Sequence, residues 1–177
     1  MMVRYFAYGS NMLPQRLQRR CASARIDVMA TLPGFGLSFS KISNDGSGKA
    51  TIVSSTYAKA RVYGIVFHLA SDDMPVLDGF EGRGKGYQRL ENVIVYAHPE
   101  RHPLTVTTYI AEHDHMDDSL QPFDWYLDLV VEGARVGGLP KDYCRRLAAT
   151  PACVDHYPKR DSQQEALAIL AETGGFK

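Results

Sequence analysis

The order of the strand and helix patterns constrains the fold of this chain most strongly. Apolar runs typical of β-strands follow one another up to Ala111, whereas the long helical patterns begin only after Gln121. The predicted strands cover residues 3–8, 25–32, 36–42, 50–55, 61–69, 87–96 and 104–111. A doubly wound fold would alternate strands with long helices throughout. This order therefore predicts an α+β domain built on a curved or barrel-like sheet.

Helical patterns fall at the end of the chain and at two earlier places. Pro14 opens one of them in the first turn, where a missing N–H does no harm. Gly137 and Gly138 end another, whose apolar residues form one continuous stripe. Helices are predicted over residues 14–20, 71–80, 122–134, 140–149 and 162–172. Residues 1–154 are expected to form one domain, and residues 155–177 a helical C-terminal tail.

Charge and apolar content argue against a nucleic-acid or membrane partner, and cysteine content indicates the cellular location. The 177 residues carry 20 Lys and Arg against 20 Asp and Glu, so no net charge attracts nucleic acid or an anionic membrane. No apolar run reaches the roughly 18 residues of a membrane span, and the N-terminus shows no signal-peptide pattern. The 3 cysteines include no C-x-x-C pair, which favours reduced thiols and a cytoplasmic location. The basic cluster at residues 16–20 predicts a solvated helix face, with phosphate binding as the alternative.

Most common site motifs fail on their spacing. The stretch SNDGSGKAT has Ser43 where a P-loop needs glycine and Ala50 where it needs Ser or Thr. The stretch GRGKGY has Tyr87 where a dinucleotide motif needs its third glycine. The histidines at 98, 102, 113 and 115 lack the converging ligands of a zinc site, so no metal is predicted. The cysteines and Ser10 lack the motif of a catalytic nucleophile.

The stretch VLDGFEGRGKGYQR holds a carboxylate in an unusual place. Glu81 stands where a predicted helix ends, and the helix dipole disfavours a negative charge there. The glycines at 82, 84 and 86 let the backbone turn sharply and approach another group closely. Local rules leave two interpretations open: Glu81 is a solvated loop residue, or it is a functional carboxylate.

Three segments of the chain resemble one known family. YFAYGSNM (5–12) and LDGFEG with GYQR (77–89) resemble the two signature segments of the gamma-glutamylcyclotransferase family. WYLDLVVEGARVGGLPKDYCRRL (125–147) resembles its C-terminal segment. The resemblance implies a small mixed β-barrel flanked by helices. It also implies an enzyme without metal or organic cofactor, which converts a γ-glutamyl amide into 5-oxoproline and a free amine.

The resemblance also assigns residues to roles. Glu81 is expected to be the catalytic residue that transfers protons, in a pocket expected to be largely apolar. The substrate-binding residues are expected to be Tyr8, Gly9, Ser10, Asn11, Met12, Tyr87 and Tyr126. The backbone N–H groups of residues 9–12 suit an anion such as the substrate α-carboxylate. Gly9 is expected to let the substrate approach the main chain.

An alternative from another class stays open at this point. The chain could be a non-catalytic binding protein for a γ-glutamyl or amino-acid ligand. Glu81 favours the enzyme, because a protein that only binds a carboxylate-bearing ligand gains nothing from a second carboxylate beside it. The partner is expected to be a small γ-glutamyl molecule, whose leaving amine is undetermined. The oligomeric state is also undetermined, with a homodimer as one option.

Overall fold

A closed β-barrel forms the centre of the molecule in this computed structural model, which describes residues 1–174. Its strands are β1 (Met2–Ala7), β2 (Arg25–Pro33), β5 (Arg61–Ala70), β6 (Tyr87–Ala97) and β7 (Pro103–Ala111). They are hydrogen-bonded in the order β1-β5-β2-β6-β7. The β1–β7 contact is parallel and the other pairs are antiparallel, so the predicted mixed barrel is confirmed.

A two-stranded hairpin forms a second sheet beside the barrel. It consists of β3 (Phe35–Ile42) and β4 (Gly48–Ser54), joined by the turn predicted at residues 44–48. Ser38 pairs with Thr51 and Lys41 pairs with Lys49, so β3 carries one extra residue opposite Ala50. The Ala111 N–H donates to Thr51 Oγ1 at 2.9 Å and ties the hairpin to β7.

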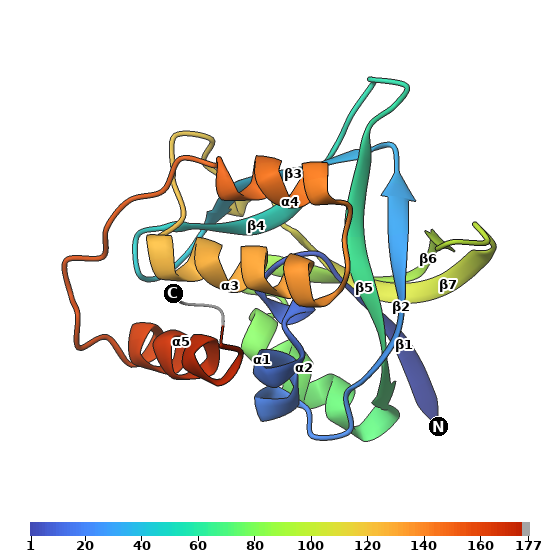
Figure 1. Ribbon diagram of the computed structural model, residues 1–177, viewed down its shortest axis with the longest axis horizontal. Helices are drawn as coiled ribbons and strands as arrows, with labels where there is room; N and C mark the ends of the chain where they lie inside the picture. The colour runs from blue at the N-terminus through green and yellow to red at the C-terminus, as the bar shows by residue number, and fades with distance from the viewer. Residues whose placement is uncertain (175–177) are drawn as a thin grey trace.

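Helices cover one side and one end of the barrel (Figure 1). The helices are α1 (Pro14–Arg20), α2 (Met74–Glu81), α3 (Asp124–Val136), α4 (Lys141–Ala148) and α5 (Asp161–Glu172). Figure 1 shows α3, α4 and α5 to the left of the barrel, with α1 and α2 at its lower end. Short 3₁₀ turns, η1 (Ser10–Met12), η2 (Ser71–Asp73) and η3 (His113–His115), complete the elements. Each predicted strand and helix is present, with ends that differ by one or two residues, apart from the η2 turn that opens the helix predicted at 71–80.

The last helix belongs to the same hydrophobic core as the barrel. Ala166, Ile169 and Leu170 of α5 are buried in one cluster with Phe6 of β1 and Leu129 of α3. Full burial of a side chain such as Ile169 stabilises by about 1.5–3 kcal/mol. The helix therefore packs on the preceding chain, while the domain boundary at residue 154 stays a prediction.

No helix within residues 1–174 combines the length and the apolar character that a bilayer crossing requires.

Candidate active site

The carboxylate of Glu81 is placed by the way α2 ends. Gly82 follows Glu81 with φ 64° and ψ 48°, a left-handed conformation that glycine adopts without strain. The helix is thereby stopped, and the Glu81 side chain reaches the loop that follows β1. Its side chain is 14% exposed. Glu81 therefore lies at the predicted helix end, and it is not a solvated loop residue.

One oxygen of Glu81 is anchored by two donors. Asn11 Nδ2 lies 2.7 Å from Glu81 Oε1, and Arg20 Nη1 lies 3.3 Å from the same oxygen. No residue within 1–174 makes a hydrogen bond to Oε2. The expectation of a largely apolar surrounding is wrong, because an amide and a guanidinium contact the carboxylate. The result is a carboxylate with one fixed oxygen and one oxygen available to a ligand.

Asn11 connects three elements around this carboxylate. Its Nδ2 also lies 3.1 Å from the hydroxyl of Tyr5, and its Oδ1 accepts from Arg20 Nη1 at 3.1 Å. Arg20 lies over the ring of Phe80, with its guanidinium carbon 5.0 Å from the centroid. Asn11 thus ties β1, α1 and α2 to one point.

The basic cluster of α1 faces this site as well. Arg16 is 6% exposed, and its Nε donates to Ser10 Oγ at 3.1 Å. Burial lowers the pKa of Arg16 to about 10, with a contribution from the like charge of Arg20. The prediction that residues 16–20 form a solvated helix face is wrong for Arg16 and Arg20. Both side chains are shielded from solvent, because η1 and α5 pack against α1. Gln18 and Arg19 are the exposed residues of the cluster, and Arg19 pairs with Glu172.

The Gly-Ser-Asn loop is a 3₁₀ turn at the end of a buried strand. The Met12 N–H bonds to the Gly9 carbonyl at 3.0 Å. The N–H groups of Ser10 and Asn11 have no backbone hydrogen-bond partner within residues 1–174. Gly9 has φ −112°, which any residue can adopt. The position favours glycine because little room is left for a side chain: a Cβ there would lie 3.0 Å from Ala50 Cβ and 3.5 Å from Tyr126 Oη.

Two tyrosine hydroxyls hold the main chain of Ala50. The Tyr87 hydroxyl donates to the Ala50 carbonyl at 2.6 Å, and the Ala50 N–H donates to Tyr126 Oη at 3.1 Å. The extra residue in β3 lies opposite Ala50 and removes the regular pairing at this position. The bulge therefore explains why the polar groups of Ala50 are satisfied by side chains.

Tyrosines make up half of the wall of a small cavity around Glu81. The cavity measures about 30 Å³ and is lined by Tyr5, Tyr8, Gly9, Ser10, Asn11, Ala50, Glu81, Tyr87, Tyr109 and Tyr126. Burial raises the pKa of each of these tyrosines, and the negative charge of Glu81 contributes. Their hydroxyls are therefore neutral hydrogen-bonding groups. This space holds about one water molecule, so a longer ligand must extend outward or move the wall.

The structure brings together every predicted site residue except Met12. Met12 is completely buried, and its Cβ would lie 2.9 Å from a Cβ added at Gly133 of α3. It packs under the loop and does not line the cavity. Tyr5, Tyr109 and Arg20 contact the site but were not predicted. Arg16 and Arg20 stand at i and i+4, and that spacing was the one available sign of a shared helix face.

Thiol chemistry has little support in this geometry. Burial raises the pKa of Cys21 to about 11, with a contribution from Asp73, and burial also raises the pKa of Cys144. A nucleophilic cysteine needs the opposite shift.

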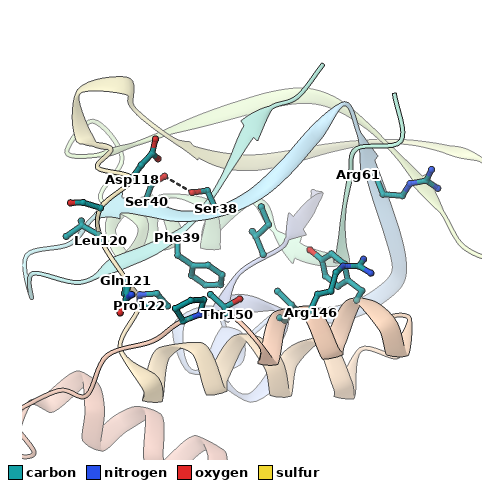
Figure 2. A pocket seen from close by; sticks show the side chains of 15 residues that line it. Ser38, Phe39, Ser40, Arg61, Asp118, Leu120, Gln121, Pro122, Arg146 and Thr150 are labelled. Atoms are coloured by element: carbon teal, nitrogen blue, oxygen red, sulfur yellow. Dashed lines mark hydrogen bonds between the residues drawn. The ribbon is translucent and has the colours of Figure 1, made fainter. Parts of the chain in front are cut away.

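A much larger cavity lies elsewhere, between β3, residues 118–122 and α4 (Figure 2). It measures about 590 Å³, with Asp118 and Leu120 at one end and Arg61 and Arg146 at the other. Phe39 lines it and packs edge-on against Tyr126, with ring centroids 6.4 Å apart. Glu81 and the 9–11 loop do not line this cavity, so the candidate active site is chosen by its chemistry and not by its volume.

Comparisons with known proteins agree with the resemblance. A family model described as the AIG2-like family matches residues 61–147. Human gamma-glutamylcyclotransferase is 32% identical over 150 residues, covering 82% of this chain and 77% of that protein. The mouse gamma-glutamylcyclotransferase is 31% identical over the same shares. A solved gamma-glutamyl cyclotransferase structure superposes with a TM-score of 0.84 at 27% identity, covering 95% of this chain and 99% of that one.

Fold and site define a small-barrel protein whose cavity holds one anchored carboxylate beside a Gly-Ser-Asn loop. Within that class, the chain belongs to the gamma-glutamylcyclotransferase family.

Proposed function

We propose that this protein converts a γ-glutamyl amide into 5-oxoproline and a free amine. Membership of the gamma-glutamylcyclotransferase family supports this activity. The observation that carries the proposal is the placement of Glu81: one carboxylate oxygen is anchored by Asn11 and Arg20, and the other has no donor among the described residues. A binding protein would have no use for such a carboxylate, so the non-catalytic alternative is not favoured.

The reaction needs no protein nucleophile. The substrate α-amine attacks the γ-carbonyl carbon, a C–N bond forms and closes the five-membered ring, and the C–N bond to the leaving amine breaks. Intramolecular attack in a favourable geometry has a large effective molarity, so holding the glutamyl chain folded supplies much of the catalysis. The α-ammonium must lose a proton for attack, and the leaving amine must gain one.

In this proposal Glu81 performs both proton transfers. Its Oε2 takes a proton from the α-ammonium, which frees the amine for attack, and passes it to the leaving nitrogen. The attacking nitrogen then loses its second proton by the same route, so that the products are the lactam N–H of 5-oxoproline and the leaving amine as its ammonium. Fixing Oε1 restricts rotation of the carboxylate, which keeps Oε2 directed at the substrate. A carboxyl group that serves first as base and then as acid ends the cycle in its starting state.

The wall of the cavity supplies the binding groups. The N–H groups of Ser10 and Asn11 would bind the substrate α-carboxylate, with the positive charges of Arg16 and Arg20 behind them. The hydroxyls of Tyr87 and Tyr126 would lie along the glutamyl chain and hydrogen-bond it. Tyr8 completes this wall, with its hydroxyl donating to the Tyr109 carbonyl.

A substrate panel tests the proposal directly. The purified protein is incubated with γ-glutamyl amino acids, γ-glutamyl-lysine isopeptide, glutathione and simple γ-glutamyl amines, and 5-oxoproline is quantified. We expect release from at least one class, with unchanged rates in EDTA. Saturable binding of a panel member without any release would instead support the non-catalytic alternative.

The cellular location forms part of the proposal. All three cysteines, Cys21, Cys144 and Cys153, are free, which suits a reducing compartment such as the cytoplasm.

A further inference from the structure

Lys41 of β3 lies against a residue that lines the Glu81 cavity. Its Nζ is 4.9 Å from the centroid of the Tyr87 ring, and the Tyr87 hydroxyl reaches the Ala50 carbonyl inside the cavity wall. The Lys41 side chain is half-buried, and its ammonium group lies against the ring of this lining residue and not in open solvent. A cation over an aromatic face is attracted by the ring quadrupole, and this contact favours the observed position.

The backbone of Gly86 lies next to the end of the Lys41 side chain. A Cβ at Gly86 would lie 2.8 Å from Lys41 Cε and 3.1 Å from Nζ, so a side chain there would displace the end of the lysine from its observed position. Gly86 also has φ 126°, a conformation that other residues rarely adopt. The absence of a side chain at Gly86 therefore leaves the space that the Lys41 ammonium group occupies.

The charge of Lys41 is not neutralised by a neighbouring side chain. Within residues 1–174 no carboxylate oxygen lies within 4.0 Å of its Nζ. Glu81, Asp45 and Glu112 act on it from farther away. Glu81 and Asp45 each have a closer cationic partner, Arg20 at 3.3 Å and Lys49 at 2.7 Å. Lys41 is thus held in place with its charge available.

We propose that Lys41 is a specificity-determining residue that binds a carboxylate on the leaving amine. The inference rests on the proposed function. The cavity of about 30 Å³ is too small to enclose the whole amide, so the leaving half must extend beyond the lining residues, and Lys41 lies directly against one of these, Tyr87. An unpaired, positioned ammonium there favours γ-glutamyl amides of amino acids over those of neutral amines.

A matched pair of substrates tests this role. γ-Glutamyl-alanine and its C-terminal amide share one leaving skeleton and differ in the carboxylate charge. In the unmodified protein we expect kcat/KM to be about 10-fold or more higher for the acid, the effect of a typical charge-assisted hydrogen bond. In Lys41→Gln this ratio should fall to near one, mainly through KM for the acid. Lys41→Arg should restore most of the preference, and Lys85→Gln, on an exposed loop residue, should keep it in full.

The outcomes separate this inference from the proposed function. Release of 5-oxoproline from both substrates at equal kcat/KM in the unmodified protein would overturn the role of Lys41 alone. An equal loss with both substrates in Lys41→Gln would also overturn it, because a merely structural lysine would act that way. Release from neither substrate nor from any other member of the panel would contradict the proposed function, and this inference with it.

Discussion

The side-chain nitrogen of Asn11 lies 2.7 Å from Oε1 of Glu81, although 70 positions separate the two residues in the chain. The contact joins the turn after β1 to the last residue of α2. Asn11 and Glu81 each belong to one of the two segments that resemble the family signatures. Since Asn11 also donates to the hydroxyl of Tyr5 and accepts from Arg20, its amide fixes the position of the carboxylate together with Arg20.

Replacing the carboxylate by an amide should remove most of the activity. Glu81→Gln keeps the shape of the side chain and an oxygen that can accept from Asn11, but it cannot transfer protons. General acid–base catalysis typically contributes about 10²–10⁴-fold, so kcat for 5-oxoproline release should fall by that order. Substrate binding should persist, because the loop at residues 9–11 supplies the anion contacts in the proposed function.

Stability gives the control for this substitution. The helix dipole alone would favour loss of a negative charge at the end of α2. Arg20, however, is only 13% exposed at its side chain and would lose its ionic partner. We therefore expect a decrease of about 1–2 kcal/mol in the free energy of unfolding, measured by urea titration. A folded Glu81→Gln variant with kcat within a few-fold of the unmodified protein would rule out the proton-transfer role.

The space beside Gly9 leads to a prediction that a second substitution can reverse. In Gly9→Ala the new Cβ would meet Ala50 Cβ at 3.0 Å, tighter than ordinary contact, and would push β4 from the loop. We expect kcat/KM to fall by about 10-fold, because displacements of this size disturb a positioned site. Adding Ala50→Gly removes the obstructing atom and should recover most of the loss.

Gly79 provides the matched control. A Cβ there meets no atom within 4 Å, and the residue lies in α2. Gly79→Ala should leave kcat/KM unchanged and stabilise the fold by about 0.5–1 kcal/mol. If the double variant at Gly9 and Ala50 stays as slow as Gly9→Ala, the contact with Ala50 does not explain the need for glycine.

The two tyrosines that hold Ala50 should contribute to stability as well as to the site. Tyr87→Phe leaves the Ala50 carbonyl without its donor, and Tyr126→Phe leaves the Ala50 N–H without its acceptor. A buried polar group without a partner costs about 1–3 kcal/mol. Chemical denaturation of each variant should show a loss in this range, whereas Tyr57→Phe, at a side chain exposed to solvent, should stay within about 0.5 kcal/mol. Losses no larger than that of Tyr57→Phe would show that water replaces the hydroxyls.

The strands and helices could be predicted because their signals are local. The apolar run along residues 61–69 reflects a buried strand, and the apolar stripe of residues 122–134 reflects a helix buried on one face; each segment carries this signal in its own residues. Glycine and proline marked the ends, as at Gly82 and Pro14. The bulge opposite Ala50 has no such local signal, since pairing register depends on the partner strand.

The site was predictable only where residues close in sequence carry it. Glu81 and the loop at residues 9–11 were found through the motif segments. Tyr109 comes from β7 and reaches the cavity only because the barrel closes, and Arg20 reaches it only because α1 folds beside α2. Met12 was assigned to the site with its neighbours in the motif. One 3₁₀ turn rotates its side chain away from the cavity and under α3.

The segment before α5 should make stability depend on pH in acid. The Asp155 side chain is completely buried. It accepts from Arg160 Nε at 2.7 Å, from Trp125 Nε1 at 3.2 Å and from the Tyr157 N–H at 3.0 Å. These donors, Arg160 first, lower the pKa of Asp155 to about 2 against the opposing effect of burial. Because an unfolded Asp titrates near 3.9, the folded state binds fewer protons between these values.

The stabilisation from Asp155 is therefore present in full above about pH 4 and is lost as the pH falls toward about 2. Asp155→Asn lacks the carboxylate, so its Tm should be lower than that of the unmodified protein at pH 7, and the difference should shrink from pH 4 to pH 2. Asp114→Asn, at an exposed η3 residue, controls for the general effect of removing one negative charge. Melting curves at intervals between pH 7 and pH 2 provide the measurement. Two parallel Tm profiles, with the Asp155→Asn deficit unchanged down to pH 2, would show that packing against Trp125, and not the charge of Asp155, holds this segment in place.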